Sequence, residues 1–266
     1  MIQAILFKSK EYVSYRFRAK GIHKLHSPFV FEFASKVLAD TTDYPEYKQL
    51  SKIRKRTFSN RNVIETVDFG SNSGNKDFST YRIRVKTLTK RRSHSFKLQK
   101  LLFRISRYVQ PEILLEMGTS TGLSTASLAL GSPEARFLTM EGCASVAQIA
   151  QSNMDAIGQQ NVELVIGNFN QTLMGALEQL AQLDLVFFDG NHRKKPTLDY
   201  FDQCVLKATE NSVFIIDDIY WSKEMKEAWN EIKTHSKVGL TIDVFQFGIV
   251  FFKKDIEKQH FVLRKH

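Results

Sequence analysis

The sequence predicts an α/β fold in which a mostly parallel sheet is covered by helices on both faces. Two observations support this prediction. From residue 113 onwards, short apolar runs with the length of buried strands alternate with helix-like segments, a pattern typical of parallel strands joined by crossover helices. At 113–124 an apolar run passes through Gly118 and Gly122 into a helical pattern, which indicates a strand, a tight turn and a helix.

Residues 1–94 are predicted to be a basic, mainly helical N-terminal region. Apolar residues of 1–40 recur on one helical face. Proline disfavours the α conformation in the residue before it, so this pattern is interrupted at Pro28, and Ser27 and Pro28 are expected to begin a second helix. A third, basic helix is expected at 47–56.

The stretch that follows is less regular. Residues 63–74 superficially repeat the pattern of a strand followed by glycines, but the residues after them are polar and basic, and we do not interpret them as a second ligand-binding turn. Lys86–Arg92 is expected to be a mobile or partner-bound loop. A helix is then predicted to begin at Ser95 and to end at Pro111, just before the central strand.

The second predicted domain, 95–266, contains the alternating elements. With the strand at 113–115, the expected strands number seven, and the last two are expected to form an antiparallel pair. The remaining strands are expected at 135–141, 162–166, 183–188, 212–216, 240–247 and 249–252, and the helices between them at 145–157, 172–182, 197–206 and 223–234.

Composition excludes several classes of protein. No run approaches the roughly 18 apolar residues of a membrane span, and the apolar stretch at the N-terminus is too short for a secretory signal. Cys143 and Cys204 have neither the number nor the spacing of a disulfide framework or a metal site. These features predict a cytoplasmic protein.

The net charge of +10 is unevenly distributed. Residues 1–110 carry 24 Lys and Arg against 8 Asp and Glu, a net +16, whereas residues 111–266 carry 14 against 20, a net −6. The basic surface of the N-terminal part could attract RNA, a membrane face or an acidic substrate, or it could simply be solvated.

The central turn does not have the spacing of a nucleotide-binding motif. Its G-x-x-x-G pattern differs from the G-x-G-x-x-G of dinucleotide-binding folds, and it lacks the Lys with which a P-loop holds phosphates. Glu116 stands two residues before the first glycine, which suits a ligand with a cationic end and hydroxyl groups better than a polyphosphate.

The segment Glu116-Met-Gly-Thr-Ser-Thr-Gly122 resembles the first motif of class I S-adenosylmethionine-dependent methyltransferases, in particular the catechol O-methyltransferase-like group. The resemblance covers about 113–254 and implies a Rossmann-like, seven-stranded, mostly parallel sheet with an antiparallel last strand. It also implies that S-adenosylmethionine is the cofactor. The cofactor-binding residues implied for this turn are Glu116, Gly118, Thr119, Ser120, Gly122 and Ser124.

Further cofactor contacts are expected after the next two strands, because open α/β sheets bind ligands at the carboxyl ends of their strands. Glu141, followed by Gly142, ends the second strand, where a carboxylate can accept hydrogen bonds from ribose hydroxyls. Asn168 and Phe169 follow the third strand and offer an amide and a ring for an adenine. Each also has a structural interpretation, Glu141 as a helix N-terminal charge and Phe169 as a core residue.

Three carboxylates follow strands four and five. Asp189 ends one strand, and Asp217 and Asp218 end the next. Close carboxylates repel one another unless a cation lies among them, and Mg²⁺ favours such oxygen ligands. The cluster resembles the metal site of catechol-type O-methyltransferases, with Asp218 where that family has an amide. Either the extra charge binds the ion more tightly, or one aspartate caps the turn at Tyr220 and no ion is bound.

His192 is the candidate general base, with Asp189 as a second catalytic and cofactor-binding candidate. His192 lies three residues after Asp189, where the family places a basic residue facing the substrate hydroxyl. Histidine can take up a proton at neutral pH. The alternative is a loop histidine that pairs with Asp189.

The sequence therefore predicts an S-adenosylmethionine-dependent O-methyltransferase, assisted by Mg²⁺, that acts on a small hydroxylated acceptor. One alternative is an RNA methyltransferase that docks RNA on the basic N-terminal region. Another is a non-catalytic module that binds S-adenosylmethionine or a partner. A homodimer formed through the N-terminal helices is the expected assembly.

Overall fold

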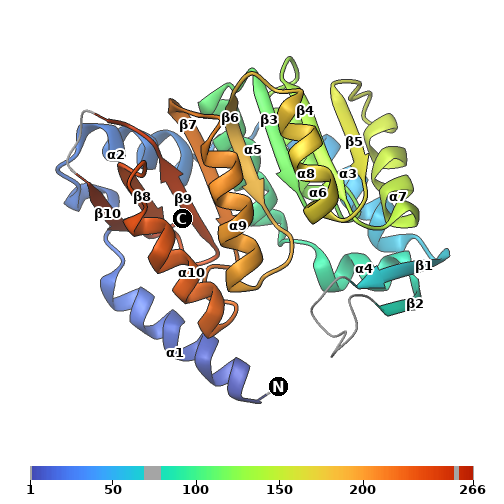
Figure 1. Ribbon diagram of the computed structural model, residues 1–266, viewed down its shortest axis with the longest axis horizontal. Helices are drawn as coiled ribbons and strands as arrows, with labels where there is room; N and C mark the ends of the chain where they lie inside the picture. Colours follow the sequence, from blue (N-terminus) through green and yellow to red (C-terminus); the bar gives the residue numbers. More distant parts are fainter. Residues whose placement is uncertain (1, 69–78, 255–257, 266) are drawn as a thin grey trace. The chain divides into compact units, whose positions relative to one another are not determined.

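Residues 2–68, 79–254 and 258–265 are described by the computed structural model of the protein (Figure 1). The chain forms two compact units. Unit 1 comprises Met1–Thr41 and Ala181–His266, and unit 2 comprises Thr42–Leu180. These units are groupings by contact, so the predicted domain boundary between residues 94 and 95 stays a prediction.

Unit 2 contains the glycine turn and the first three strands of the mostly parallel sheet. Strand β4 is parallel to β3 on one side and to β5 on the other, with Leu138 opposite Leu115 and Thr139 opposite Leu164. In chain order its elements are α3 (Glu46–Ser59), β1 (Val63–Asp68), β2 (Ser79–Arg84), α4 (Val85–Arg92), α5 (Phe96–Val109), β3 (Ile113–Met117), α6 (Leu123–Gly131), β4 (Arg136–Glu141), α7 (Ala144–Asp155), β5 (Val162–Ile166) and α8 (Phe169–Glu178).

Helices α3, α5, α6 and α7 share one buried cluster in unit 2. Helix α5 begins where predicted, because the Ser95 hydroxyl accepts a hydrogen bond from the Leu98 N–H at 3.4 Å. Phe103 of α5 is fully buried, and its ring lies 5.2 Å from the ring of Tyr47 on α3. The other buried members of the cluster are Leu50, Ile53, Leu123, Ala126, Leu130 and Met154.

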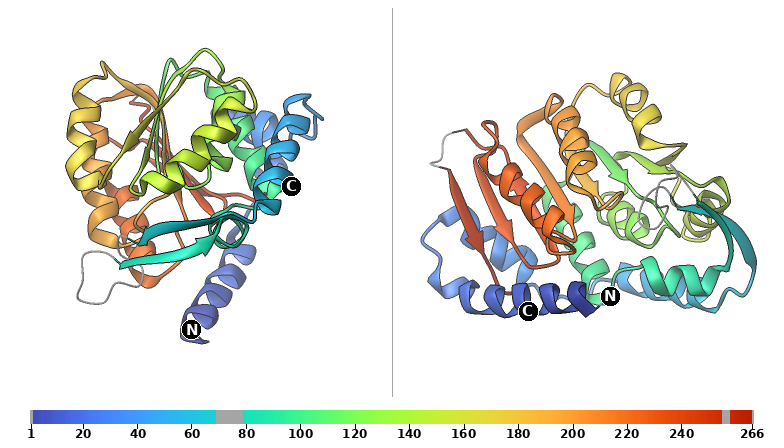
Figure 2. Two further views of the ribbon diagram at one scale, coloured as in Figure 1. Left: turned by 90° about the vertical axis from the view of Figure 1, so that its right-hand side faces the viewer. Right: turned by 60° about the horizontal axis from the view of Figure 1, so that its bottom comes forward.

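The predicted loop at Lys86–Arg92 is wrong, because Val85–Arg92 forms helix α4. Its apolar residues Val85 and Leu88 are fully buried, and Leu88 belongs to a cluster with Val146 at the start of α7. These two buried apolar residues anchor the helix, and its four basic residues concealed the pattern. Strands β1 and β2 form an antiparallel pair before α4 (Figure 2); the glycines of the predicted decoy pattern lie outside the described residues.

Unit 1 carries the other strands, in the order β10-β8-β9-β7-β6. Strand β6 is parallel to β7, whereas β9 is antiparallel to β7 and β8. Strand β10, parallel to β8, adds to the seven predicted strands. The elements of unit 1 are α1 (Ile2–Arg18), η1 (Ile22–Lys24), α2 (Pro28–Phe33), η2 (Ala34–Leu38), β6 (Leu183–Phe188), α9 (Lys194–Val205), β7 (Ala208–Asp217), α10 (Lys223–Thr234), β8 (Leu240–Asp243), β9 (Phe247–Phe251) and β10 (Gln259–Val262).

Helices cover both faces of the unit 1 strands. The Phe201 ring of α9 lies 5.9 Å from Phe214 on β7, and the Phe29 ring of α2 lies 5.1 Å from Phe251 on β9. Phe251 pairs with Val213, the neighbour of Phe214, so Phe214 and Phe251 point to opposite faces. The predicted Rossmann-like fold class, a mostly parallel sheet between helices, is confirmed.

Helix α1 is attached to the C-terminal part of unit 1 by polar contacts. Lys226 of α10 donates to both carboxylate oxygens of Glu11 at 2.7 and 2.8 Å, and the Tyr15 hydroxyl donates to the Leu263 carbonyl at 2.6 Å. The opposite side of α1 exposes apolar side chains, among them Phe17, which is 87% exposed. Contacts with residues that are distant in the sequence therefore hold α1 in unit 1.

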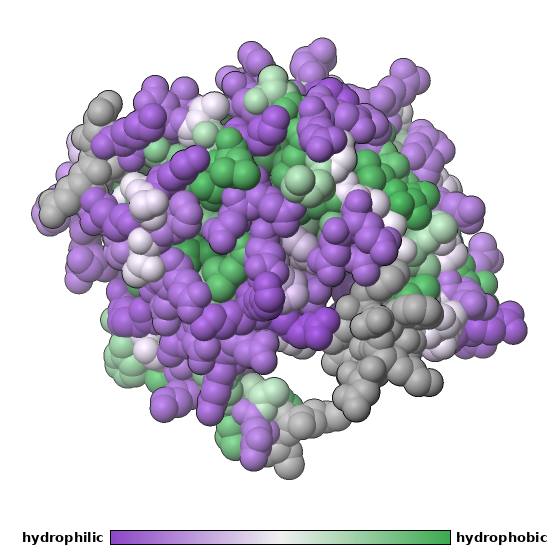
Figure 3. All heavy atoms as spheres, viewed as in Figure 1, coloured by the Kyte–Doolittle hydropathy of each residue, from purple (hydrophilic) through white to green (hydrophobic). Residues whose placement is uncertain are grey.

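Hydrophilic side chains predominate on one face of the molecule (Figure 3). The face drawn in Figure 3 is covered mainly by hydrophilic side chains, with smaller hydrophobic patches between them. Among the described residues, the structure contains no helix whose length and apolar character would allow it to span a membrane.

Gly131 at the end of α6 gives a direct test of the packing in unit 2. A Cβ added there would lie 2.6 Å from the Phe103 carbonyl oxygen and 2.8 Å from the Ser106 Cβ. Because a backbone carbonyl cannot move aside cheaply, Gly131→Ala is expected to lower the free energy of unfolding by about 1–3 kcal/mol. Urea denaturation measures the change.

Gly175 on α8 is the matched control. A Cβ at this exposed position meets none of the described atoms within 4 Å, so Gly175→Ala is expected to stabilise the protein by about 0.4–1 kcal/mol. Equal effects of the two substitutions would contradict the close packing of α6 against α5.

Candidate functional site

The turn after β3 has the backbone geometry that its glycines allow. Gly122 has φ +78°, and a Cβ there would lie 3.0 Å from the Ala150 Cα, so both conformation and space require glycine. The N–H groups of Gly118 and Thr119 donate to the Met140 carbonyl of β4 at 2.9 and 3.0 Å. The turn is thereby fixed beside the end of β4, and α6 begins directly after it. The positive φ values in this turn are those of Gly118, Ser120 and Gly122.

Glu116 is fully buried beneath this turn. Its Oε2 accepts hydrogen bonds from the hydroxyls of Thr125 on α6, at 2.5 Å, and Thr139 on β4, at 2.6 Å. The Thr119 and Thr139 hydroxyls are also 2.6 Å apart. Glu116 therefore joins β3, β4 and α6, and its predicted contact with the cofactor stays a prediction.

Glu141 closes the turn from the end of β4. Its Oε2 accepts a hydrogen bond from the Ser120 N–H and its Oε1 from the Cys143 N–H, both at 2.9 Å. Burial raises the pKa of Glu141, whereas the N–H groups of Cys143 and Ser120 and the charge of Arg92 act to lower it. A carboxylate has about four lone-pair sites, and the N–H groups of Ser120, Cys143 and Gly142 act on three of them, so Glu141 retains capacity for a further donor.

Asn168 and Phe169 lie at the start of α8. The Asn168 side chain accepts a hydrogen bond from the Asn170 N–H at 3.0 Å and so caps the helix. Both residues are half-buried. The preceding Gly167 N–H donates to the Glu141 carbonyl at 3.0 Å, which brings the ends of β4 and β5 together.

A second group of predicted residues lies in unit 1, after β6 and β7. Asp189 and His192 follow β6, with the His192 Nε2 3.6 Å from the Asp189 Oδ1. Asp217 ends β7 and is 2% exposed. His192, Asp217 and Asp218 each offer one potential ligand atom, and these atoms lie within 4.8 Å of one another. The structure thus brings together all four residues predicted for the metal site and the general base.

The burial and the close carboxylates of this cluster change the pKa of Asp217. Burial raises the pKa of the Asp217 carboxyl well above its ordinary value, and the neighbouring carboxylates of Asp189 and Asp218 raise it further. Such a group is stabilised in its charged form by a cation placed among the carboxylates. The donor set of carboxylate oxygens and an imidazole fits a divalent ion.

Asp218 lies in the turn between β7 and α10. Its backbone carbonyl, and not its side chain, accepts the Trp221 N–H at 2.8 Å to close the turn. Its carboxylate instead lies 3.4 Å from the Lys8 Nζ of α1. Tyr220 is buried and donates a hydrogen bond to Asp243, so it is a core residue of unit 1.

Two basic residues near these groups were missed by sequence reasoning. Lys8 lies beside Asp218 and 4.6 Å from the centre of the Trp221 ring, and the charge of Arg92 acts on Glu141. Lys8 is 210 residues from Asp218 in the chain, and Arg92 lies in a helix that was expected to be a loop. Neither had a local sequence signal beyond its positive charge.

Each group lies within its own unit. The turn, Glu116, Glu141 and the Asn168–Phe169 pair belong to unit 2, whereas the carboxylates and His192 belong to unit 1. The ligand-binding roles of the individual residues stay predictions.

The central part of the chain is similar in sequence to known methyltransferase domains. Residues 115–219 match the sequence model of a protein family described as "Methyltransferase domain". This segment runs from β3, through the turn, Glu141 and Asp189, to the residues just after Asp217 and Asp218. The predicted resemblance to class I S-adenosylmethionine-dependent methyltransferases is confirmed.

Curated relatives narrow the resemblance to the catechol type. The chain is 31% identical over 124 residues to catechol O-methyltransferase of Mycobacterium tuberculosis, a match that covers 45% of this chain and 54% of that protein. It is 30% identical over 130 residues to catechol O-methyltransferase of Bos taurus, covering 47% of each. The chain spans about half the length of the curated relatives it matches.

Solved structures share the fold. An O-methyltransferase from Bacillus cereus in complex with SAH superposes with a TM-score of 0.56 at 18% identity, covering 85% of this chain and 97% of that chain. The SAH-bound methyltransferase PaMTH1 of Podospora anserina has a TM-score of 0.60 at 14% identity, covering 86% and 97%. At these identities the likeness concerns the fold.

Proposed function

We propose that this protein is an S-adenosylmethionine-dependent methyltransferase that methylates a hydroxyl oxygen of a small, catechol-like acceptor with the help of a divalent metal ion. The observation that carries the proposal is the cluster in unit 1. His192 lies beside Asp189, and it offers a potential ligand atom within 4.8 Å of those of Asp217 and Asp218. The curated relatives named catechol O-methyltransferase support the same reaction.

The cofactor is assigned to unit 2. Gly118 and Gly122 carry no side chains in the turn between β3 and α6, so a ligand can approach the N-terminus of α6 closely. Glu141 would accept a hydrogen bond from a ribose hydroxyl with the capacity that its backbone N–H donors leave available. S-adenosylmethionine supplies a methyl group on a sulfonium, which is its own leaving group.

The residues of unit 1 fit a divalent ion. Asp189, Asp217 and Asp218 would hold it with carboxylate oxygens, and its charge would relieve the repulsion that raises the pKa of Asp217. A bound Mg²⁺ would lower the pKa of an acceptor hydroxyl and orient it. The Lys8 Nζ lies 3.4 Å from the Asp218 Oδ1 and so places one positive charge beside the carboxylates.

His192 would take the proton of the acceptor hydroxyl. The acceptor oxygen then forms the new bond to the methyl carbon while the carbon–sulfur bond breaks, and the electron pair of that bond stays on sulfur. Asp189 orients the imidazole and stabilises its positive charge after it takes the proton, because its carboxylate lies 3.6 Å from the Nε2. In such transfers the protein contributes mainly positioning and proton removal.

Two measurements test the proposal. Isothermal titration with S-adenosylmethionine is expected to show binding near micromolar, and transfer of the labelled methyl group to catechol is expected to require Mg²⁺ and to stop in EDTA. Absence of cofactor binding would overturn the proposal. Cofactor binding without transfer to catechol would instead favour a non-catalytic module or another acceptor, such as RNA.

Replacement of Glu141 tests its proposed role in binding S-adenosylmethionine. Glu141→Ala removes one hydrogen bond to the turn, from Ser120, one from Cys143 before α7, and the acceptors proposed for the ribose. The Kd for S-adenosylmethionine is therefore expected to rise by about 10–100-fold. Glu163→Ala, at an exposed position on β5, is the control and should leave the Kd unchanged. An unchanged Kd in Glu141→Ala would remove Glu141 from the cofactor site.

A further inference from the structure

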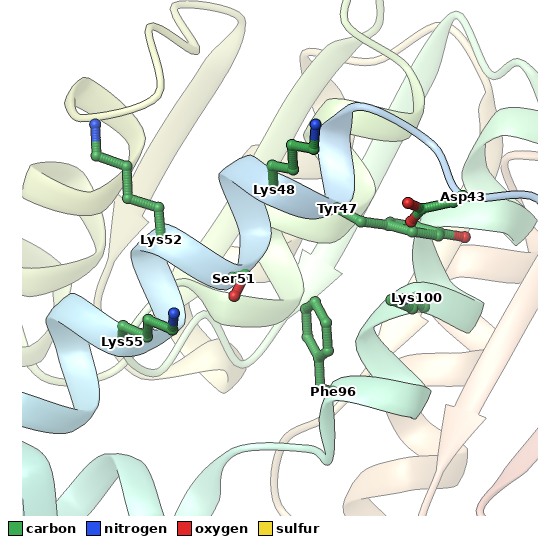
Figure 4. Close-up of a pocket in the computed structure, with 8 residues that line it drawn as sticks. All are labelled: Asp43, Tyr47, Lys48, Ser51, Lys52, Lys55, Phe96 and Lys100. Carbon is green, nitrogen blue, oxygen red and sulfur yellow. The ribbon is translucent and has the colours of Figure 1, made fainter.

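Unit 2 has a basic pocket that the proposed methyl transfer does not use. The pocket has a volume of about 440 Å³ and lies between α3 and α5 (Figure 4). Four of its lining residues are lysines, and one, Asp43, is acidic. The residues that line it are Asp43, Tyr47, Lys48, Ser51, Lys52, Lys55, Phe96 and Lys100.

The lysines of α3 form a row along one side of the helix. Lys48, Lys52 and Lys55 are spaced by four and three residues, which places them on one helical face and spreads their Cα atoms over about 10 Å. All three are exposed, and in the described parts of the chain no carboxylate forms an ion pair with them. Their ammonium groups spread along the helix instead of meeting at one point (Figure 4).

Two aromatic rings line the pocket, and the ammonium group of a lysine lies against both of them. The Lys100 Nζ lies 4.3 Å from the centre of the Tyr47 ring and 5.1 Å from that of Phe96, an arrangement that holds the cation in place. The Phe96 ring is half-buried against the core and points toward α3, between Ser51 and Lys100 (Figure 4). A planar group could therefore stack on this ring beside a held positive charge.

We propose that the face formed by α3 and the start of α5 binds single-stranded RNA, with Lys48, Lys52 and Lys55 at successive phosphates and Phe96 stacked on a base. A row of lysines matches an extended polyanion better than a single phosphate. The aromatic ring favours a nucleic acid over a lipid headgroup, because stacking on aromatic side chains is how single strands are held without sequence preference. This binding does not depend on the proposed methyl transfer.

The test uses the full chain and a fluorescein-labelled 12-nucleotide oligouridylate, with affinity measured by anisotropy between 50 and 200 mM salt. Each phosphate contact of a single strand contributes about 0.7 to the slope of log affinity against log salt. The triple variant Lys48→Gln, Lys52→Gln and Lys55→Gln is expected to bind at least about tenfold more weakly and to reduce that slope by about 2. Phe96→Leu, which keeps an apolar contact with the core, is expected to weaken binding about fivefold or more with the same slope.

The matched control removes the same charge from exposed lysines of unit 1, with Lys10→Gln, Lys24→Gln and Lys237→Gln combined. Its affinity is expected to stay near that of the unmodified protein. An equal loss in the control, or no loss in the α3 variant, would overturn the proposal. So would binding to vesicles of phosphatidylserine and phosphatidylcholine without binding to RNA. S-adenosylmethionine titration of the α3 variant, expected to be unchanged, keeps this outcome separate from that of the proposed function.

Discussion

Replacing His192 by alanine is expected to lower kcat for catechol methylation by about 10²–10⁴-fold, because general base catalysis contributes that much when proton removal accompanies the transfer. The Kd for S-adenosylmethionine should stay the same, since the role proposed for His192 is to take the proton of the acceptor hydroxyl and not to bind the cofactor. Steady-state kinetics with labelled cofactor, together with isothermal titration, measure both quantities.

The pH profile separates a catalytic histidine from a structural one. As the pH rises, the acceptor hydroxyl ionises without help, so the difference between His192→Ala and the unmodified enzyme should shrink. His235→Ala is the control, because His235 is also a half-buried histidine of unit 1, 3.9 Å from Asp202. A loss of activity in His192→Ala that is constant over pH, or that His235→Ala equals, would contradict the assigned role.

Asp217→Asn is expected to have opposite effects on stability with and without metal. Burial and the charges of Asp189 and Asp218 raise the pKa of Asp217 in the folded protein. The folded state therefore binds the proton more tightly than the unfolded state, and the stability that this proton contributes is lost as the pH rises above the ordinary value of 3.8. At pH 7 in EDTA, the neutral amide should raise the midpoint of thermal unfolding.

With Mg²⁺ the order should reverse. Ligand binding stabilises a folded protein by about 2.7 kcal/mol at 100 times Kd, and a chain without the Asp217 carboxylate should gain much less. Its affinity for Mg²⁺ should fall by more than the about 10–100-fold typical of losing a residue that only supports a ligand. Thermal unfolding in EDTA and in a MgCl₂ series measures both effects.

Asp202→Asn is the control for the charge change, because this carboxylate is exposed. Its unfolding midpoint should respond to Mg²⁺ as that of the unmodified protein does. If Asp217→Asn also showed the full response to Mg²⁺, the metal site would have to lie elsewhere.

The strands and helices of the α/β region were predictable because each carries its own local signal. Strand β5 and helix α10 have the predicted bounds, 162–166 and 223–234. Helix α4 was missed because Val85 and Leu88 are its only apolar residues and four of its eight residues are basic. Strand β10 was missed because a four-residue strand pairs only through contacts with β8, which lies about 20 residues earlier.

The candidate site residues that stand directly at the end of a strand were predictable. The turn, Glu141, Asp189 and the Asp217–Asp218 pair all occupy the predicted strand ends. The hydrogen bonds that engage Glu116 and Glu141 with the scaffold were not predictable, because they depend on hydroxyl and N–H groups brought close by folding. The homodimer and the cytoplasmic location stay predictions.

The attachment of α1 has a consequence for how the protein is made. Glu11 leaves the ribosome first, but its partner Lys226 is added 215 residues later, roughly ten to forty seconds afterwards at about 5–20 residues per second. Unit 2 is contiguous and can assemble during translation, whereas unit 1 must wait for the last strand. The side of α1 that carries Glu11 and Tyr15 therefore lacks its partners until the C-terminal part of unit 1 has been made.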